Sequence, residues 1–332
     1  SFSKKASIGV AGSYNEISGT LKAYVGEGNT ADQETIVNAG YLSILALSEA
    51  SVMNISVGGG AGGKVAVNGS VSINNISNDV TAFIKNTVAA VDDSINLSAM
   101  DESEIQSIAG AVGGSQTAAV GAALAMNYIG SFGALGETQR ISAYIENSRV
   151  VAENGSVTVA AHSLAVIKSI SAAGGGGGKA AVYGAVSLNF INTDIAAYIK
   201  DCISPEGTAD AQKKLVNANS GITLSALDKS SISVIAGNVA GAGTASVGAA
   251  VAIVYIGNGD LASFDKYVNN DEYTAEEASE NRDITERDYD YDDPGFTETS
   301  KIRVYIDNSS VTSAAGAVRL KATAESNIIN IS

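Results

Sequence analysis

The sequence has no tryptophan, and its 332 residues include only six phenylalanines, two prolines, one histidine and one cysteine. A globular core of this size normally uses more large aromatic side chains. The single cysteine, Cys202, excludes an internal disulfide, so the chain is not a disulfide scaffold. Because Cys202 stands beside an insertion, we interpret it as a passive buried or surface thiol rather than a reactive one.

Basic residues are also scarce, since 20 Lys and Arg stand against 35 Asp and Glu and the net charge is −15. A phosphate-binding face needs clustered Lys and Arg, so we expect neither nucleic acid nor an anionic membrane surface as a partner. The uncharged run 240–257 is long enough to suggest a membrane span. Its equivalents elsewhere carry polar residues such as Asn68 and Ser187 with a period of two, which predicts a half-buried strand instead.

The abundant residues are 36 glycines together with Ala, Val and Ile, and they form an internal repeat. Five units share an anchor position followed two residues later by Ile, and the anchors lie 53 to 65 residues apart. The anchors are Asn15, Asn74, Asn127, Asn189 and Val254. A fixed internal period of this kind indicates stacked modules rather than one globular core.

The segments around the anchors alternate with a period of two, one face being aliphatic and the other small or polar. Small β-branched side chains in rows are typical of a narrow solenoid interior. We therefore predict an all-β, parallel β-solenoid (β-helix), built from about five imperfect repeats over residues 1–332. A unit of this size has room for two or three rungs, which predicts a rod roughly 50–70 Å tall. The sequence begins and ends within the pattern, so we expect a longer repetitive protein around it.

In-register stacking places like residues above one another. We predict a structural ladder of side-chain amides at Asn15, Asn74, Asn127 and Asn189. Each unit also has an Ala-Tyr-Ile strand or a close variant, which predicts an aromatic stack of Tyr24, Phe83, Tyr144, Tyr198 and Tyr305. We expect these rings to pack inside the rung; exposed rings would instead be able to hold a sugar or a partner.

Glycine runs before Lys64 and Lys179 superficially resemble a phosphate-binding loop. That motif leads from a strand into a helix, whereas here another strand pattern follows the lysine, so we interpret the glycines as tight turns or close approaches between layers. Four loop insertions interrupt the repeats, at 26–39, 131–139, 202–219 and 260–300. In 26–39 and 202–219 we expect a turn or two of helix, capped by Thr or Asp.

The insertion 260–300 is strongly acidic, and a loop of this length is either functional or disordered. Its alternating carboxylates Asp288, Asp290 and Asp292, with Asp293, make weak candidates for calcium ligands. Gly and Glu are missing from the sixth and twelfth positions, so an EF-hand is not supported. A solvated acidic loop is the main interpretation, with calcium and a partner-binding site as alternatives, and we expect no other cofactor.

Catalytic patterns are lacking. The lone histidine, His162, has no repeated acidic partner, and no supported nucleophile elbow is found. Some parallel β-helices cleave polysaccharides with carboxylates gathered across rungs, whereas the densest group of carboxylates here, 14 of 35, lies in one insertion. We therefore assign no catalytic residues and keep a polysaccharide-active enzyme only as a remote alternative.

Residues 120–129 (VGAALAMNYI), 143–150 (AYIENSRV) and 154–161 (NGSVTVAA) resemble the repeats of leukotoxin-type filamentous adhesins, within the wider filamentous-haemagglutinin class of bacterial surface proteins. The resemblance covers nearly the whole chain except 260–300. It implies a right-handed parallel solenoid that is secreted to the cell surface, where it acts as a shaft without catalytic residues. Its expected partners are proteins or glycans of host or neighbouring cells.

Two function classes follow. The first is a structural and adhesive spacer that projects binding regions from the cell. The alternative is a self-assembling extracellular fibre or surface-layer component. We base the alternative on the face of small residues that includes Ala119, Gly121, Ala123 and Ala125, because an exposed small-residue face would permit close lateral association.

Overall fold

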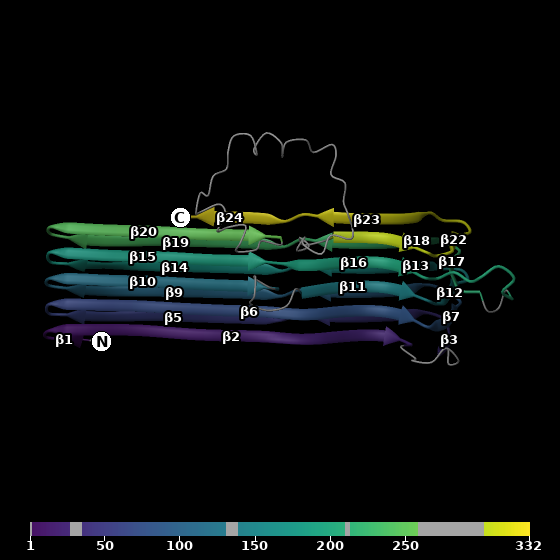
Figure 1. Ribbon diagram of the computed structural model, residues 1–332, viewed down its shortest axis with the longest axis horizontal. Coiled ribbons are helices and arrows are strands. Elements are labelled where there is room, and N and C mark those ends of the chain that lie inside the picture. Colours follow the sequence, from purple (N-terminus) through teal and green to yellow (C-terminus); the bar gives the residue numbers. More distant parts are fainter. Residues whose placement is uncertain (1, 27–34, 131–138, 210–212, 258–301) are drawn as a thin grey trace, which may run out of the picture.

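The structure, a computed structural model, describes residues 2–26, 35–130, 139–209, 213–257 and 302–332. Within these ranges the chain forms 24 strands and no helix. Strands pair in parallel with their equivalents one turn earlier and one turn later. The chain is therefore a parallel β-solenoid, as predicted, and Figure 1 shows its turns lying one above another.

Each turn passes through four parallel sheets, which we number 1 to 4. Sheet 1 contains β1 (Phe2–Ser3), β5 (Ser51–Gly62), β9 (Glu104–Ser115), β14 (Val166–Gly177), β19 (Ser231–Ala242) and β24 (Asn327–Ile331). Sheet 2 contains β2 (Ala6–Val25), β6 (Val65–Lys85), β10 (Ala118–Ile129), β11 (Gln139–Glu146), β15 (Ala180–Ile191), β16 (Thr193–Lys200), β20 (Ala245–Ile256) and β21 (Ile302–Asp307).

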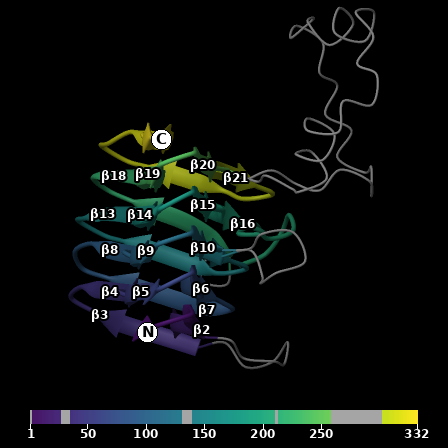
Figure 2. The same cartoon turned by 90° about the vertical axis from the view of Figure 1, so that its left-hand side faces the viewer.

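Sheets 3 and 4 close the other end of each turn. Sheet 3 contains β3 (Thr35–Ala39), β7 (Thr87–Val91), β12 (Arg149–Ala152), β17 (Leu215–Ala218) and β22 (Val311–Ser313). Sheet 4 contains β4 (Leu42–Ser48), β8 (Ile95–Asp101), β13 (Ser156–Ser163), β18 (Gly221–Asp228) and β23 (Val318–Ala324). The view in Figure 2 shows that a turn is a flattened loop, with sheet 2 forming one broad side and sheets 1 and 4 the other.

The repeat found in the sequence is the register of the sheets. The anchors pair in the order Asn15, Asn74, Asn127, Asn189 and Val254. Each unit therefore supplies one turn, and the expectation of two or three rungs per unit is wrong. With five strands in sheets 3 and 4, the described turns span about 24 Å along the stack rather than 50–70 Å.

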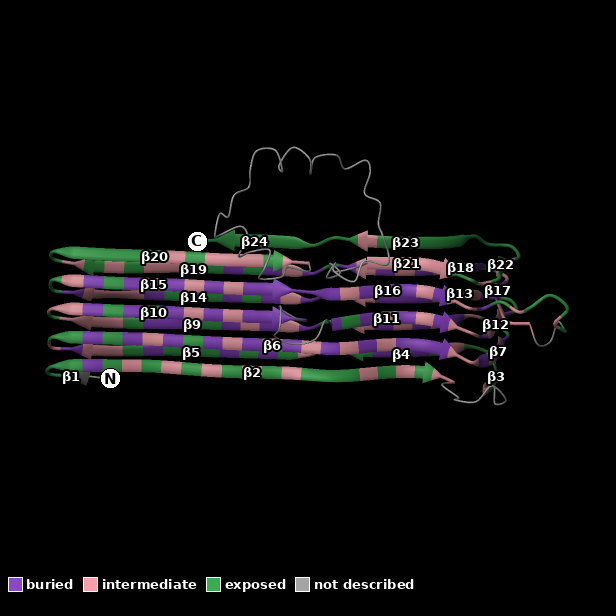
Figure 3. Ribbon diagram, viewed as in Figure 1, coloured by how far each residue is buried: buried purple, intermediate pink, exposed green. Residues whose placement is uncertain are grey.

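The two halves of each turn have different interiors. The half enclosed by sheets 3 and 4 and by the C-terminal part of sheet 2 has an aliphatic core of stacked rows, for example Ile84, Ile145 and Ile199. The half between sheet 1 and the N-terminal part of sheet 2 is lined mostly by small and polar side chains, for example Ala123, Ser187 and Asn189. Figure 3 shows how buried and exposed residues alternate along the strands that enclose this second half.

In this second half the small face is turned inward and the aliphatic face outward. Ala119, Ala123 and Ala125 are buried, whereas Val120 is 43% exposed. Gly121 is buried as well. The expectation that this small face lies on the surface for lateral packing is therefore wrong. A physical reason is the close approach of the sheets, since a Cβ at Gly58 would lie 1.9 Å from the carbonyl oxygen of Gly69.

The predicted insertions are partly strand. β3 occupies the end of segment 26–39, and β17 lies within 202–219, so both insertions are shorter than expected. Their described residues form no helix, contrary to expectation. The acidic segment 260–300 lies outside the described residues, and so do the calcium candidates Asp288, Asp290, Asp292 and Asp293.

Candidate functional site

The four predicted asparagines form one row of hydrogen-bonded amides in the interior. Each Nδ2 donates to the Oδ1 of the next residue in the row: Asn15 to Asn74 over 2.8 Å, Asn74 to Asn127 over 2.8 Å, and Asn127 to Asn189 over 2.7 Å. Asn74, Asn127 and Asn189 are fully buried. Because an amide both donates and accepts, one residue type satisfies its neighbours on both sides.

This amide ladder also joins the two sheets, through partners that the sequence analysis missed. In sheet 1, Asn54 donates to Asn74 Oδ1 over 2.8 Å, and Ser169 accepts from Asn127 over 3.1 Å. Ser107 lies between Asn54 and Ser169 in register and contacts Ser72 Oγ over 2.9 Å. The sequence signal was a polar residue at the same alternating position of β5, β9 and β14. The arrangement is a cross-sheet structural network.

The five predicted aromatic residues form one continuous stack along sheet 2. Neighbouring ring centroids are 4.8–5.0 Å apart, and interplanar angles are 2–4°. The rings lie on the outer face of the sheet, because Ala82 and Ile84 on either side of Phe83 point into the core. The expectation of packing inside the rung is therefore wrong.

The stack nevertheless offers little to a sugar. Phe83 is only 2% exposed, since Tyr24 and Tyr144 cover its two faces. A stacked sugar needs an open aromatic face, and a ring within the stack presents only its edge. Burial is also the main cause that raises the pKa of Tyr198. We interpret this row as a structural element that aligns successive turns.

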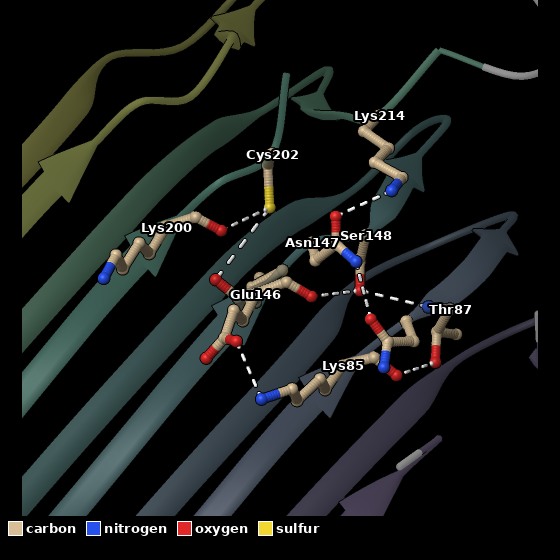
Figure 4. Close-up of polar contacts among 10 residues, drawn as sticks. Lys85, Thr87, Glu146, Asn147, Ser148, Lys200, Cys202 and Lys214 are labelled. Carbon is tan, nitrogen blue, oxygen red and sulfur yellow. Dashed lines mark hydrogen bonds and ion pairs between the residues drawn. The ribbon is translucent and has the colours of Figure 1, made fainter. Parts of the chain in front are cut away.

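The corner after the aromatic strand carries two further rows of polar groups (Figure 4). Asn86, Asn147, Asp201 and Asn308 all have positive φ angles of 42–55°, in the left-handed region that Asn and Asp tolerate best after glycine. Asn147 donates to Asn86 Oδ1 over 2.6 Å, and Asn308 donates to Asp201 Oδ1 over 2.7 Å. The available sequence signal was an Asn or Asp three residues after the aromatic residue in the last four units, though not after Tyr24.

The second row at this corner consists of the next residue in each turn, and Cys202 stands there where other turns have a serine or threonine (Figure 4). Ser148 and Ser309 donate from Oγ to the carbonyl oxygen two residues earlier, each over 2.7 Å, and Thr87 does so over 2.9 Å. The Cys202 thiol points in the same way at the Lys200 carbonyl, 3.3 Å away, and its backbone N–H donates to Ser309 Oγ. Burial raises the pKa of the thiol to about 11.

Cys202 should consequently react slowly and accept serine in its place. We expect a thiol reagent at neutral pH to modify the folded chain at least ~100-fold more slowly than the unfolded chain, because thiolate is scarce and buried. Cys202→Ser should change the free energy of unfolding by less than about 1 kcal/mol. Reaction of Ellman's reagent with native and urea-unfolded protein measures the first, and urea titration the second. Fast native labelling would contradict the structural role.

Asp101 and His162 are also enclosed, the first fully and the second partly. Asp101 is fully buried, and Ser103 donates to it from Oγ over 2.8 Å and from its backbone N–H over 3.3 Å; burial raises the pKa of this carboxyl. Burial lowers the pKa of His162, whose Nε2 lies 3.4 Å from Ser225 Oγ. Among the residues that the structure describes, neither has an acid, a base and a nucleophile arranged around it.

Within the described ranges, no group of three or more His, Cys, Asp and Glu side chains is placed to hold a metal ion. Over the same part of the chain, no helix has the length and apolar character that crossing a membrane would need. The run 240–257 that suggested a span instead contains strand β20 and the end of β19.

Comparison of the chain with protein-family models, with curated proteins and with solved structures finds no match in any of the three.

Proposed function

We propose that this chain is a structural spacer segment of a large, secreted bacterial surface adhesin, and that it projects binding regions away from the cell. The supporting observation is the unbroken stacking of turns: in all four sheets, strands pair from the first turn to the last. Each inner strand hydrogen-bonds to a neighbour on both sides, so bending the stack strains many bonds together. In this role the chain is not an enzyme and needs no cofactor.

The side-chain rows favour a load-bearing role over a binding role for the solenoid body. The amide and aromatic rows join successive turns, and at the hydroxyl row the backbone N–H of Thr87 donates to Ser148 Oγ of the next turn. Polar groups that already hydrogen-bond within the stack are not available to a ligand. Binding to proteins or glycans of host or neighbouring cells then belongs to other regions that the shaft carries.

The proposal is tested by displaying the chain on bacterial cells between an outer-membrane anchor and a fluorescent binding domain, as one copy or as two tandem copies. Each copy should raise the reporter above the membrane by about 24 Å, measured by energy transfer to a membrane dye. A flexible Gly/Ser linker of equal residue number is the control, because its reporter heights should be broadly distributed.

Two results would overturn the spacer role. One is a reporter height that does not increase with the second copy. The other is saturable binding of the purified chain to host cells or their glycans, which would make the segment itself the adhesive part.

A further inference from the structure

The outer side of the small-residue half carries an apolar surface, which we call the valine face. It consists of three adjacent rows on β6, β10, β15 and β20, with the strands in register. The first row is Val67, Val120, Val182 and Val247; the second is Gly69, Ala122, Gly184 and Ala249; the third is Val71, Leu124, Val186 and Val251. Two ridges of branched side chains thus enclose a groove floored by Gly and Ala.

The valine face is open to solvent and uncharged. Val120 and Val182 are 43% and 46% exposed, although they lie on central strands. Every outward-facing position in 65–73, 118–126, 180–188 and 245–253 is Gly, Ala, Val, Leu, Ile or Met. The net charge of the chain is −15, yet none of these outward-facing positions is acidic. Contiguous exposed apolar patches of this kind mark interaction sites.

The opposite outer face, on sheet 1, is different. Its rows also contain exposed aliphatic residues such as Ile108 and Ile170. However, Lys168 and Glu104 form an ion pair of 2.7 Å on the same strands, β14 and β9. Burying that pair against an apolar partner would cost desolvation energy, so the valine face is the better candidate for a dry contact.

We propose that the valine face binds the valine face of a second copy of this chain. The strands of successive turns run side by side with little visible twist, so the surface is flat enough to meet its own copy (Figure 1). A twofold axis allows a ridge of each copy to enter the groove of the other, and every side chain then meets an uncharged partner.

The size of the surface agrees with a pair of copies. β2 extends the apolar surface at one edge, although Val10 stands there in the groove row and Gly12 in a ridge row. With β2 the surface measures ~24 Å along the stack and ~30 Å along the strands, which is a flat area of ~700 Å². A standard interface uses ~800 Å² of accessible surface per partner, and side-chain relief makes the accessible area larger than the flat one. Pairing also goes beyond the spacer role, which needs only one copy.

Sedimentation velocity of the whole chain tests the pairing. We expect wild type to form dimers at ~10 µM, because standard-size interfaces have affinities of micromolar or better. The pair of substitutions Val120→Lys and Val182→Lys places cations in the centre of the face and should raise the dissociation constant at least ~100-fold. The matched control is Ile108→Lys with Ile170→Lys on sheet 1, at 39% and 41% exposure, which should leave the constant within a factor of ~3.

Far-UV circular dichroism shows whether both variants retain the β-solenoid. A wild-type chain that stays monomeric up to ~100 µM would overturn the proposal, and so would equal weakening by both pairs of lysines. Growth of wild type into polymers without limit would also overturn it, since a closed twofold pair does not extend. A monomeric chain that still raised the reporter on cells would refute pairing and leave the spacer role intact.

Discussion

Replacing Asn127 with alanine is expected to lower the free energy of unfolding by about 3–5 kcal/mol. Asn127 accepts a hydrogen bond from Asn74 and donates to both Asn189 and Ser169, all inside the solenoid. Its removal leaves one N–H of Asn74 and the Oδ1 of Asn189 without a partner where water does not replace it, whereas Ser169 keeps its contact with Ser187 Oγ. Each buried polar group left unpaired costs about 1–3 kcal/mol, so the combined loss is large.

Asn15, at the end of the same ladder, provides the control for Asn127→Ala. Asn15 lies at the end of the ladder and is only partly buried, and it makes one bond, to Asn74. Asn74 Oδ1 keeps a second donor in Asn54. Asn15→Ala should therefore cost about 1 kcal/mol.

Asn127→Leu separates hydrogen bonding from cavity formation, because leucine has as many side-chain heavy atoms as asparagine and makes none of the bonds. We expect it to destabilise the chain at least as much as alanine does. Urea titration gives the change in midpoint, and hydrogen exchange of β10 and β15 shows whether the loss is local, as is usual in repeat proteins that unfold by parts. Near-wild-type stability of Asn127→Leu would contradict a role for the amide bonds.

The amide and aromatic rows were predictable because their residues recur at the same position in successive sequence units. Asn74 and Asn127 stand at the same position in their units, and in-register stacking then brings them together without further assumptions. Tyr144 and Tyr198 are aligned in the same way. The number of rungs per unit was not predictable by this reasoning. Recurring residues show which positions of successive units are equivalent, but not whether the strands within one unit stack on each other or together form one large turn.

The predicted orientation of the aliphatic and small-residue faces was wrong, because a period of two shows that residues alternate but not which face is inside. In sheet 2, Val67 faces out and Asn74 faces in. The general preference for aliphatic side chains in a core failed because the two sheets lie too close for them. A signal did exist in β6, which runs unbroken from Val65 to Lys85. Lys85 belongs on the surface, and parity along one strand then places Val67 outside as well. The sequence did not show that the strand is unbroken.

Because the small-residue face is inside, substitutions at two neighbouring alanines should have very different effects on stability. Ala123→Leu is expected to lower the free energy of unfolding by about 3 kcal/mol, whereas Ala122→Leu should change it by less than about 0.5 kcal/mol. Ala123 is 2% exposed in the Ala-rich interior, and Ser171 of sheet 1 donates to its carbonyl over 3.3 Å. Three additional carbons have no room there without separating the sheets.

Ala122 makes a stringent control because it differs from Ala123 by one position in the same strand and faces solvent. Both substitutions add the same atoms and have the same intrinsic strand preference, so the difference between them reports only which face is enclosed. Thermal and urea unfolding of both variants, measured at a concentration low enough to keep the chain monomeric, decides the matter. If Ala122→Leu were the damaging change, the small residues would form the outer surface, and the valine face would be core rather than a contact for a second copy.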